Sequence, residues 1–180
     1  PCPAATDQIT ITINELPTTD AGLSQSVCTG DSLMLEGVVG GSATSGTWTG
    51  GAGNFIPDNT TLDAVYVPDL AEYTAGSVTL TLTTDDPSGP CNAVFVDVTH
   101  NFFPVPLALF SVDNPSGCPE HCVIFSDESI PIAGNVVSWD WDFGDGTSGN
   151  TQNPAHCYNQ TDFYDITLDI TTSNGCVDKL

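Results

Sequence analysis

Short stretches in which apolar and polar residues alternate recur along this chain of 180 residues. The clearest are residues 78–82, 94–98 and 136–142, where every second residue is large and apolar. A period of two predicts β-strands with one buried face. Glycine, proline, asparagine and aspartate separate the stretches and predict turns. The pattern therefore predicts an all-β chain with almost no helix.

Three cysteines mark a displaced repeat. Cys2, Cys91 and Cys176 each stand just before an alternating stretch, and they are 89 and 85 residues apart. This spacing is the length of one β-sandwich domain. A proline-containing link follows the first two of these stretches, as expected where one module leads into the next.

The repeat predicts two sandwich modules, residues 17–105 and residues 106–180. Residues 1–16 look like the last strand of a preceding sandwich, and the second module lacks most of its own last strand. We expect strands in module one near residues 33–35, 47–49, 64–67, 78–82 and 94–98, and in module two near residues 108–112, 123–125, 136–142 and 164–170.

The first sixteen residues contain a strand that has no evident module of its own. Ile9, Ile11 and Ile13 would share one face, and without a partner they would expose three large apolar side chains and an open edge. Either these residues continue covalently from a preceding domain, or they complete the sandwich of another copy, as in donor-strand filaments.

A distinctive run lies in module two. Trp139, Trp141 and Phe143 alternate with aspartate, and Gly144 and Gly146 then supply a tight turn. His156 and Tyr158 follow in an Asn-Pro-Ala-His-Cys-Tyr segment, and Tyr164 opens a further strand.

Taken in order with their spacings, these motifs resemble the PKD domain, an immunoglobulin-like fold. The resemblance covers about the last 70 residues and implies tandem immunoglobulin-like, PKD-type β-sandwiches. It implies structural roles for the motif: Trp139 in the core on strand C, Tyr164 closing a corner by a hydrogen bond to backbone, and His156 a structural element. Residues 19–33 of module one are similar to the opening of repeats in large surface proteins of the Bacteroidetes.

The resemblance also raises a metal site. Asp140, Asp142 and Asp145 are close enough in sequence to suggest calcium, but calcium-binding members carry further acidic residues in the preceding loop, which here reads Asp127–Gly134 without a second aspartate pair. No other cofactor is expected. The side chains of Cys118, His121, Cys122, His156 and Cys157 are also of zinc-ligand types, although an oxidising exterior would consume the thiols.

Seven cysteines in a chain with two small cores favour an oxidising compartment and disulfides. In an immunoglobulin-like sandwich Cys122 and Cys157 would start strands at the same pole, so they form the best pair. Cys28, Cys91, Cys118 and Cys176 admit three pairings: counting suggests Cys28–Cys91 and Cys118–Cys176, whereas topology suggests a bridge across the module junction, for example Cys28–Cys176.

The charge of the chain limits the classes of molecule that it is expected to bind. The net charge is −22, with one basic residue against 23 acidic ones, which disfavours nucleic acid and anionic membranes. No apolar run is long enough to insert into a membrane, and no catalytic motif is present, so we do not expect an enzyme. The predicted location is extracellular, on a bacterial cell surface.

Two functions remain as hypotheses. The first is a structural repeat unit of a surface fibre, filament or adhesin, whose disulfide-stapled modules associate end to end with copies of themselves or adjacent repeats, by strand complementation in its narrower form. The alternative is an accessory module of a secreted hydrolase that binds polysaccharide or protein, including surface glycans. That alternative requires exposed aromatic residues, for which Trp48 and Trp141 are the candidates.

Overall fold

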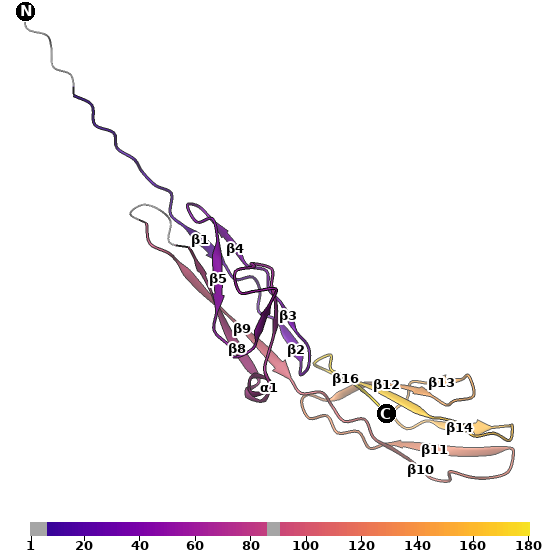
Figure 1. Cartoon of the computed structure of the whole chain (residues 1–180). Coiled ribbons are helices and arrows are strands. Elements are labelled where there is room, and N and C mark those ends of the chain that lie inside the picture. The colour runs from indigo at the N-terminus through magenta and orange to yellow at the C-terminus, as the bar shows by residue number, and fades with distance from the viewer. Residues whose placement is uncertain (1–6, 86–90) are drawn as a thin grey trace, which may run out of the picture. The chain divides into compact units, whose positions relative to one another are not determined.

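The computed structural model describes residues 7–85 and 91–180. Nearly all of its regular structure is β, as the alternation predicts (Figure 1). By internal contacts the chain divides into two compact units. The first comprises the described residues of 1–24, 33–68 and 78–99, and the second comprises residues 25–32, 69–77 and 100–180. The predicted modules 17–105 and 106–180 remain a prediction.

The first half of the chain forms short strands and one helix. They are β1 (Thr18–Asp20), β2 (Ser26–Cys28), β3 (Leu33–Met34), β4 (Val38–Gly40), β5 (Gly46–Thr49), β6 (Asn54–Ile56), β7 (Val65–Val67), α1 (Leu70–Ala75), β8 (Ser77–Thr84) and β9 (Phe95–Phe103). Hydrogen bonding gives a four-stranded sheet in the order β2-β9-β8-β5, a three-stranded sheet β3-β7-β6 and the pair β1-β4. Strand β2 runs parallel to the end of β9, with Cys28 opposite Phe103.

Strands with alternating apolar and polar residues turn their apolar side chains inward and form the core of this half. Strand β8 buries every second residue, including Leu80 and Leu82. Trp48 on β5 lies opposite Leu82 and is completely buried, and its indole Nε1 donates to the carbonyl oxygen of Leu62 at 3.1 Å. The buried donor is therefore satisfied, and Trp48 is a packing residue.

Residues 7–16 form no strand within the described part of the chain. Ile9, Ile11 and Ile13 are 89%, 80% and 91% exposed. The structure contains no second copy, so donation of this segment to another sandwich remains a prediction; residues 1–6, including Cys2, lie outside the described residues.

Strands β10 to β16 fold residues 110–179 into two facing sheets. The strands are β10 (Phe110–Val112), β11 (His121–Asp127), β12 (Val136–Asp142), β13 (Ser148–Gly149), β14 (Ala155–Tyr158), β15 (Thr167–Thr172) and β16 (Val177–Lys179). One sheet has the order β10-β11-β14 and the other β13-β12-β15-β16. The last strand, β16, is three residues long and pairs with β15.

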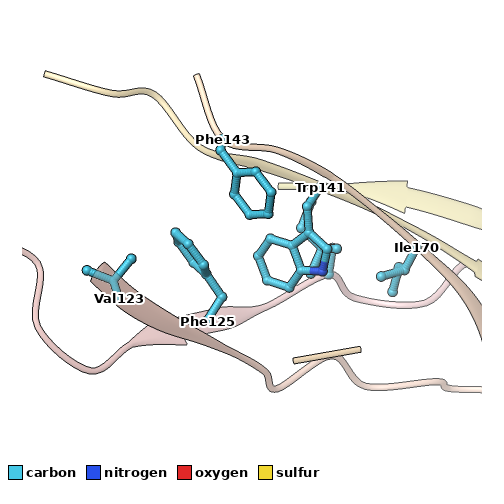
Figure 2. Close-up of a cluster of buried hydrophobic side chains, with 7 residues drawn as sticks. Val123, Phe125, Trp141, Phe143 and Ile170 are labelled. Carbon is cyan, nitrogen blue, oxygen red and sulfur yellow. The ribbon is translucent and has the colours of Figure 1, made fainter. Parts of the chain in front are cut away.

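Inward-facing side chains from both sheets form the core of this sandwich. Val123 and Phe125 come from β11, Trp141 from β12 and Ile170 from β15 (Figure 2). The ring centroid of Trp141 lies 5.4 Å from that of Phe125 and 5.1 Å from that of Phe110. Large aromatic area is thus removed from water at the centre of a small domain.

The structure reveals an internal repeat in strands β8 and β15. Thr79–Thr84 reads Thr-Leu-Thr-Leu-Thr-Thr and Thr167–Thr172 reads Thr-Leu-Asp-Ile-Thr-Thr, and in both the second, fourth and sixth residues are buried. Thr84 N donates to the Val94 carbonyl oxygen, and the Thr84 hydroxyl accepts from Val94 N. Thr172 and Cys176 make the same two contacts. Strands β9 and β16 are therefore counterparts.

Acid should destabilise the fold through His100. This side chain on β9 is 1% exposed, its Nδ1 accepts from Gln25 N at 3.1 Å, and its buried Nε2 has no hydrogen-bond partner among the described residues. Burial lowers the pKa of the imidazole from its usual 6.5, so below that pH the unfolded chain binds more protons than the folded chain. The free energy of unfolding should fall as the pH drops below 6.5.

Thermal melts from about pH 7 to about pH 5 measure this dependence in the wild type and in His100→Leu. Leucine cannot take up a proton, so the variant should lose part of the slope. An identical slope in both proteins would contradict the assignment.

Candidate interaction site

A column of four rings joins the segments of the Trp-Asp-Phe-Gly-Asp-Gly motif. The ring of His156 stacks on Phe143 with centroids 4.2 Å apart and planes 6° apart, and its edge meets Tyr158 at 4.7 Å. Tyr158 stacks on Tyr164 at 4.2 Å. The column therefore fixes the end of β12 and the segment before β15 against β14.

Polar contacts hold the column in place. The Tyr158 hydroxyl donates to the carbonyl oxygen of Phe143, and the Tyr164 hydroxyl donates to that of Gln160, both at 3.0 Å. The Tyr164 bond is the corner closure that the resemblance implies, although β15 itself begins at Thr167. Burial, and secondarily the nearby Asp145 charge, raise the pKa of Tyr158 to about 12, so this phenol stays a donor at neutral pH.

The turn aspartates serve the turn itself. The Asp142 carboxylate accepts from Gly144 N at 2.9 Å. Asp145 accepts from the backbone and hydroxyl of Thr147 and lies 2.8 Å from His156 Nε2. The Thr147 hydroxyl and then His156 lower the pKa of Asp145 to about 2. Asp140, at the exposed face of β12, is not part of this set.

No calcium-ligand cluster forms from Asp140, Asp142 and Asp145 in the described part of the chain. Within residues 7–85 and 91–180, the group of metal-ligand side chains that converge within 4.8 Å is Glu120, Cys122 and Cys157. The two cysteines are oxidised to each other, which also removes two thiols from the zinc set. Calcium binding remains a prediction without a preformed site.

Two disulfides lie in the second unit. Cys122 and Cys157, opposite each other on β11 and β14, form one with Cα atoms 3.9 Å apart. Cys28 and Cys176 form the other with Cα atoms 5.6 Å apart, which is the pairing that topology suggests and not the pairing that counting suggests. Cys91 and Cys118 are free thiols.

A groove with a volume of about 460 Å³ opens beside the ring column. Residues 115–117 and 160–166 line it, together with Val123 and Phe125 of β11. Tyr158 and Tyr164 also line it. No motif in the sequence predicts this groove.

The exposed aromatic platform required for the hydrolase-module hypothesis is not formed by Trp48 or Trp141. Both indoles are fully buried, and Trp141 Nε1 donates to the carbonyl oxygen of Thr151 at 3.0 Å. Trp139 is half-buried at the edge of the same core, and its Nε1 donates to Asp127 at 2.7 Å. Binding by this chain would have to use other surfaces, such as the groove.

The two facing sheets and the tyrosine corner define an immunoglobulin-like module, a class that is not catalytic in itself although it also occurs within enzymes. Residues 106–179 match the family model described as the PKD domain, and this part of the chain is a PKD domain.

Parts of two bacterial enzymes are similar to this chain in sequence, and a cell adhesion molecule is similar to it in fold. Seventy residues are 33% identical to Collagenase ColA of Clostridium perfringens, which is 39% of this chain and 6% of that protein. The PKD1 domain of the Vibrio cholerae metalloprotease PrtV is 29% identical over 42% of this chain and 89% of that chain, with a TM-score of 0.38. The N-terminal eight Ig domains of Down Syndrome Cell Adhesion Molecule match 92% of this chain and 26% of that chain at 11% identity and a TM-score of 0.54, a likeness of fold alone.

No helix of the described residues has the length and apolar character that crossing a membrane would require. The chain spans a small fraction of the collagenase that it matches.

Gly144 should tolerate substitution less well than Gly146. Both have positive φ, +74° and +88°, where an L side chain costs about 1–2 kcal/mol. A Cβ on Gly144 would lie 2.7 Å from the Asp165 carbonyl oxygen, whereas one on Gly146 meets open space. Gly144→Ala should therefore lower the free energy of unfolding more than Gly146→Ala, measured by urea denaturation. Equal losses would mean that backbone conformation alone makes glycine necessary here.

Proposed function

We propose that this chain is a non-catalytic structural repeat of an extracellular bacterial protein, in a surface fibre, filament or adhesin. The observation that carries the proposal is the repeat of strands β8 and β15, with the same burial and the same contacts at Thr84 and Thr172. Repeated small sandwiches extend a protein by adding modules, and each added module requires only its neighbour.

The cysteines and charge support an exterior location. Two disulfides are stable where the environment is oxidising, and they strengthen domains whose cores are small. A net charge of −22 with the single Lys179 keeps the surface soluble and repels nucleic acid and anionic lipid.

Immunogold electron microscopy of the producing bacterium tests this function. An antibody against residues 106–180 should place gold on surface fibres, at a regular spacing along each fibre. The proposal would be overturned if the cells carried no gold and the antigen were found in the culture fluid as part of a hydrolase.

The second candidate is an accessory module of a secreted hydrolase, and similarity to collagenase and metalloprotease segments favours it. In that case the chain would bind a fibrous substrate and position a catalytic domain borne by the same protein. Pull-down on insoluble collagen and on polysaccharides tests it, with retention expected for an accessory module and recovery in the wash for a structural repeat.

A further inference from the structure

The groove occupies the place that the end of the last strand has in the first repeat. Strand β9 covers nine residues, whereas its counterpart β16 covers three. The end of β9 lies between β2 and residues just before β8: Cys28 pairs with Phe103, and Phe102 N donates to the Gly76 carbonyl oxygen at 2.9 Å. No described residue takes this place after β16.

The counterparts of both neighbours of β9 line the groove. Cys28, at the end of β2, precedes the buried Leu33 by five residues, and Cys118 precedes the buried Val123 by the same number. Residues 116–118 therefore correspond to β2. Residues 164–166 lead into β15 as Gly76 and Ser77 lead into the matching part of β8. Ser116, Gly117 and residues 164–166 all line the groove. The groove therefore lies where a strand that continued from β16 would run.

The same chain carries a segment that resembles the end of β9 in its pattern and forms no strand over residues 7–17. At the spacing of 89 residues that separates Cys2 from Cys91, Ile9, Ile11 and Ile13 correspond to Val98, His100 and Phe102. Those three residues of β9 are 7%, 1% and 3% exposed, so they are its inward positions. The three isoleucines repeat an inward apolar face but are themselves exposed.

We propose that residues 9–14 of a second copy of this chain fill the groove, continuing the sheet beyond β16 between residues 116–118 and 164–166. The proposal rests on the structural-repeat function above and names its partner. Each copy then offers one strand and one groove, a heterologous contact that adds copies head to tail without closing. Burial of Ile11 and Ile13, together with backbone pairing, supplies the affinity.

The free thiols fit the same arrangement. The Cys28–Cys176 bond joins the cysteine before β3 to the cysteine before β16. In the repeat, Cys118 before β11 is the counterpart of Cys28. Cys91, three residues before Val94, precedes β9 as Cys176 precedes β16, and within residues 7–85 and 91–180 both Cys91 and Cys118 are free thiols. Cys118 of one copy and Cys91 of the next copy therefore form the corresponding bond between copies.

This bond forms by oxidation of two thiols. The two Sγ–H bonds break, one Sγ–Sγ bond forms, and the two protons and two electrons reduce a small disulfide such as oxidised glutathione to two thiols. Cys118 is exposed beside Gly117 and Pro119 of the groove, and Cys91 is half-buried.

Light scattering after size-exclusion chromatography of the chain of residues 1–180 tests the association. The wild type should form concentration-dependent oligomers, and with oxidised glutathione it should give a ladder on non-reducing gels. In a background with Cys2→Ser, which should keep the ladder, Cys118→Ser and Cys91→Ser should each abolish it but leave the reversible oligomers. A wild-type chain that stays monomeric at all concentrations would overturn the proposal.

Matched variants in the segment separate strand insertion from other contacts. Ile13→Asp should weaken association by about tenfold or more, because a carboxylate would enter an apolar groove. Thr12→Asp, on the opposite face of the same strand, should have a much smaller effect. A variant with a second copy of residues 7–17 added after Leu180 should fill the groove within each chain and stay monomeric. Unchanged oligomers of that variant would contradict the proposal that the segment binds in the groove.

The outcomes also separate this inference from the proposed function. Gold-labelled fibres on the cell together with a monomeric chain would refute strand insertion and leave the structural function standing. In a longer parent protein, residues that follow Leu180 would then be the occupant of the groove. Oligomers in solution with no antigen on cells would refute the structural function and leave strand insertion standing.

Discussion

Replacing Trp141 with alanine should lower the free energy of unfolding of the PKD domain by about 3–5 kcal/mol. The indole is fully buried and packs against Phe110 and Phe125 from the facing sheet. Alanine would leave a large cavity and would also leave the Thr151 carbonyl without its indole donor. Urea denaturation of residues 1–180 followed by far-UV circular dichroism measures the loss.

Trp139→Ala is the matched control, because it removes the same side chain two residues earlier on β12. Trp139 is half-buried, so less apolar area leaves the core, and the loss should be clearly smaller. Equal losses for the two variants would mean that Trp139 carries as much of the core as Trp141.

Removing the Cys28–Cys176 bond should cost about 5 kcal/mol, more than removing the Cys122–Cys157 bond at about 4 kcal/mol. The bonds close loops with sequence separations of 148 and 35 residues, and a longer loop restricts the unfolded chain more. The comparison uses paired serine substitutions in a background where Cys2, Cys91 and Cys118 are also serine, which removes the other thiols that could exchange. Denaturation midpoints in the reverse order would show that native contacts, not loop length, set the values.

Much of the fold follows from local patterns. The alternation at residues 136–142 coincides with β12, and the stretches near 78–82 and 94–98 lie within or overlap β8 and β9. These strands were predictable because one face is buried and the period of two is strict. Short strands such as β1 and β4 have no such period, since their pairing is set by contacts with distant residues.

The helix was missed although its signals are in the sequence. Asp69 and Glu72 form a capping box: the Asp69 carboxylate accepts from Glu72 N at 2.9 Å, and Glu72 accepts from Asp69 N at 2.8 Å. Gly76 ends the helix with φ of 79°. A helix of six residues is too short to show a helical period, so only its ends could have revealed it.

The site was less predictable than the fold. The ring column follows from the motif, since His156, Tyr158 and Tyr164 lie where the resemblance implies structural roles. The exposure of Trp48 and Trp141 could not be decided from the sequence, because the register of a strand decides which of its faces points inward and the sequence alone does not give that register. The Cys28–Cys176 pair depends on three-dimensional proximity across 148 residues, which no local pattern contains.

The Cys28–Cys176 bond also decides what would happen if the two ends of this chain were pulled apart. The covalent path would run along the residues up to Cys28, cross the sulfur–sulfur bond and leave through the last four residues, bypassing the backbone between the cysteines. That backbone, roughly 500 Å long if drawn out, would add no length until the bond was reduced. Redox conditions would thereby set how far the protein can extend under load.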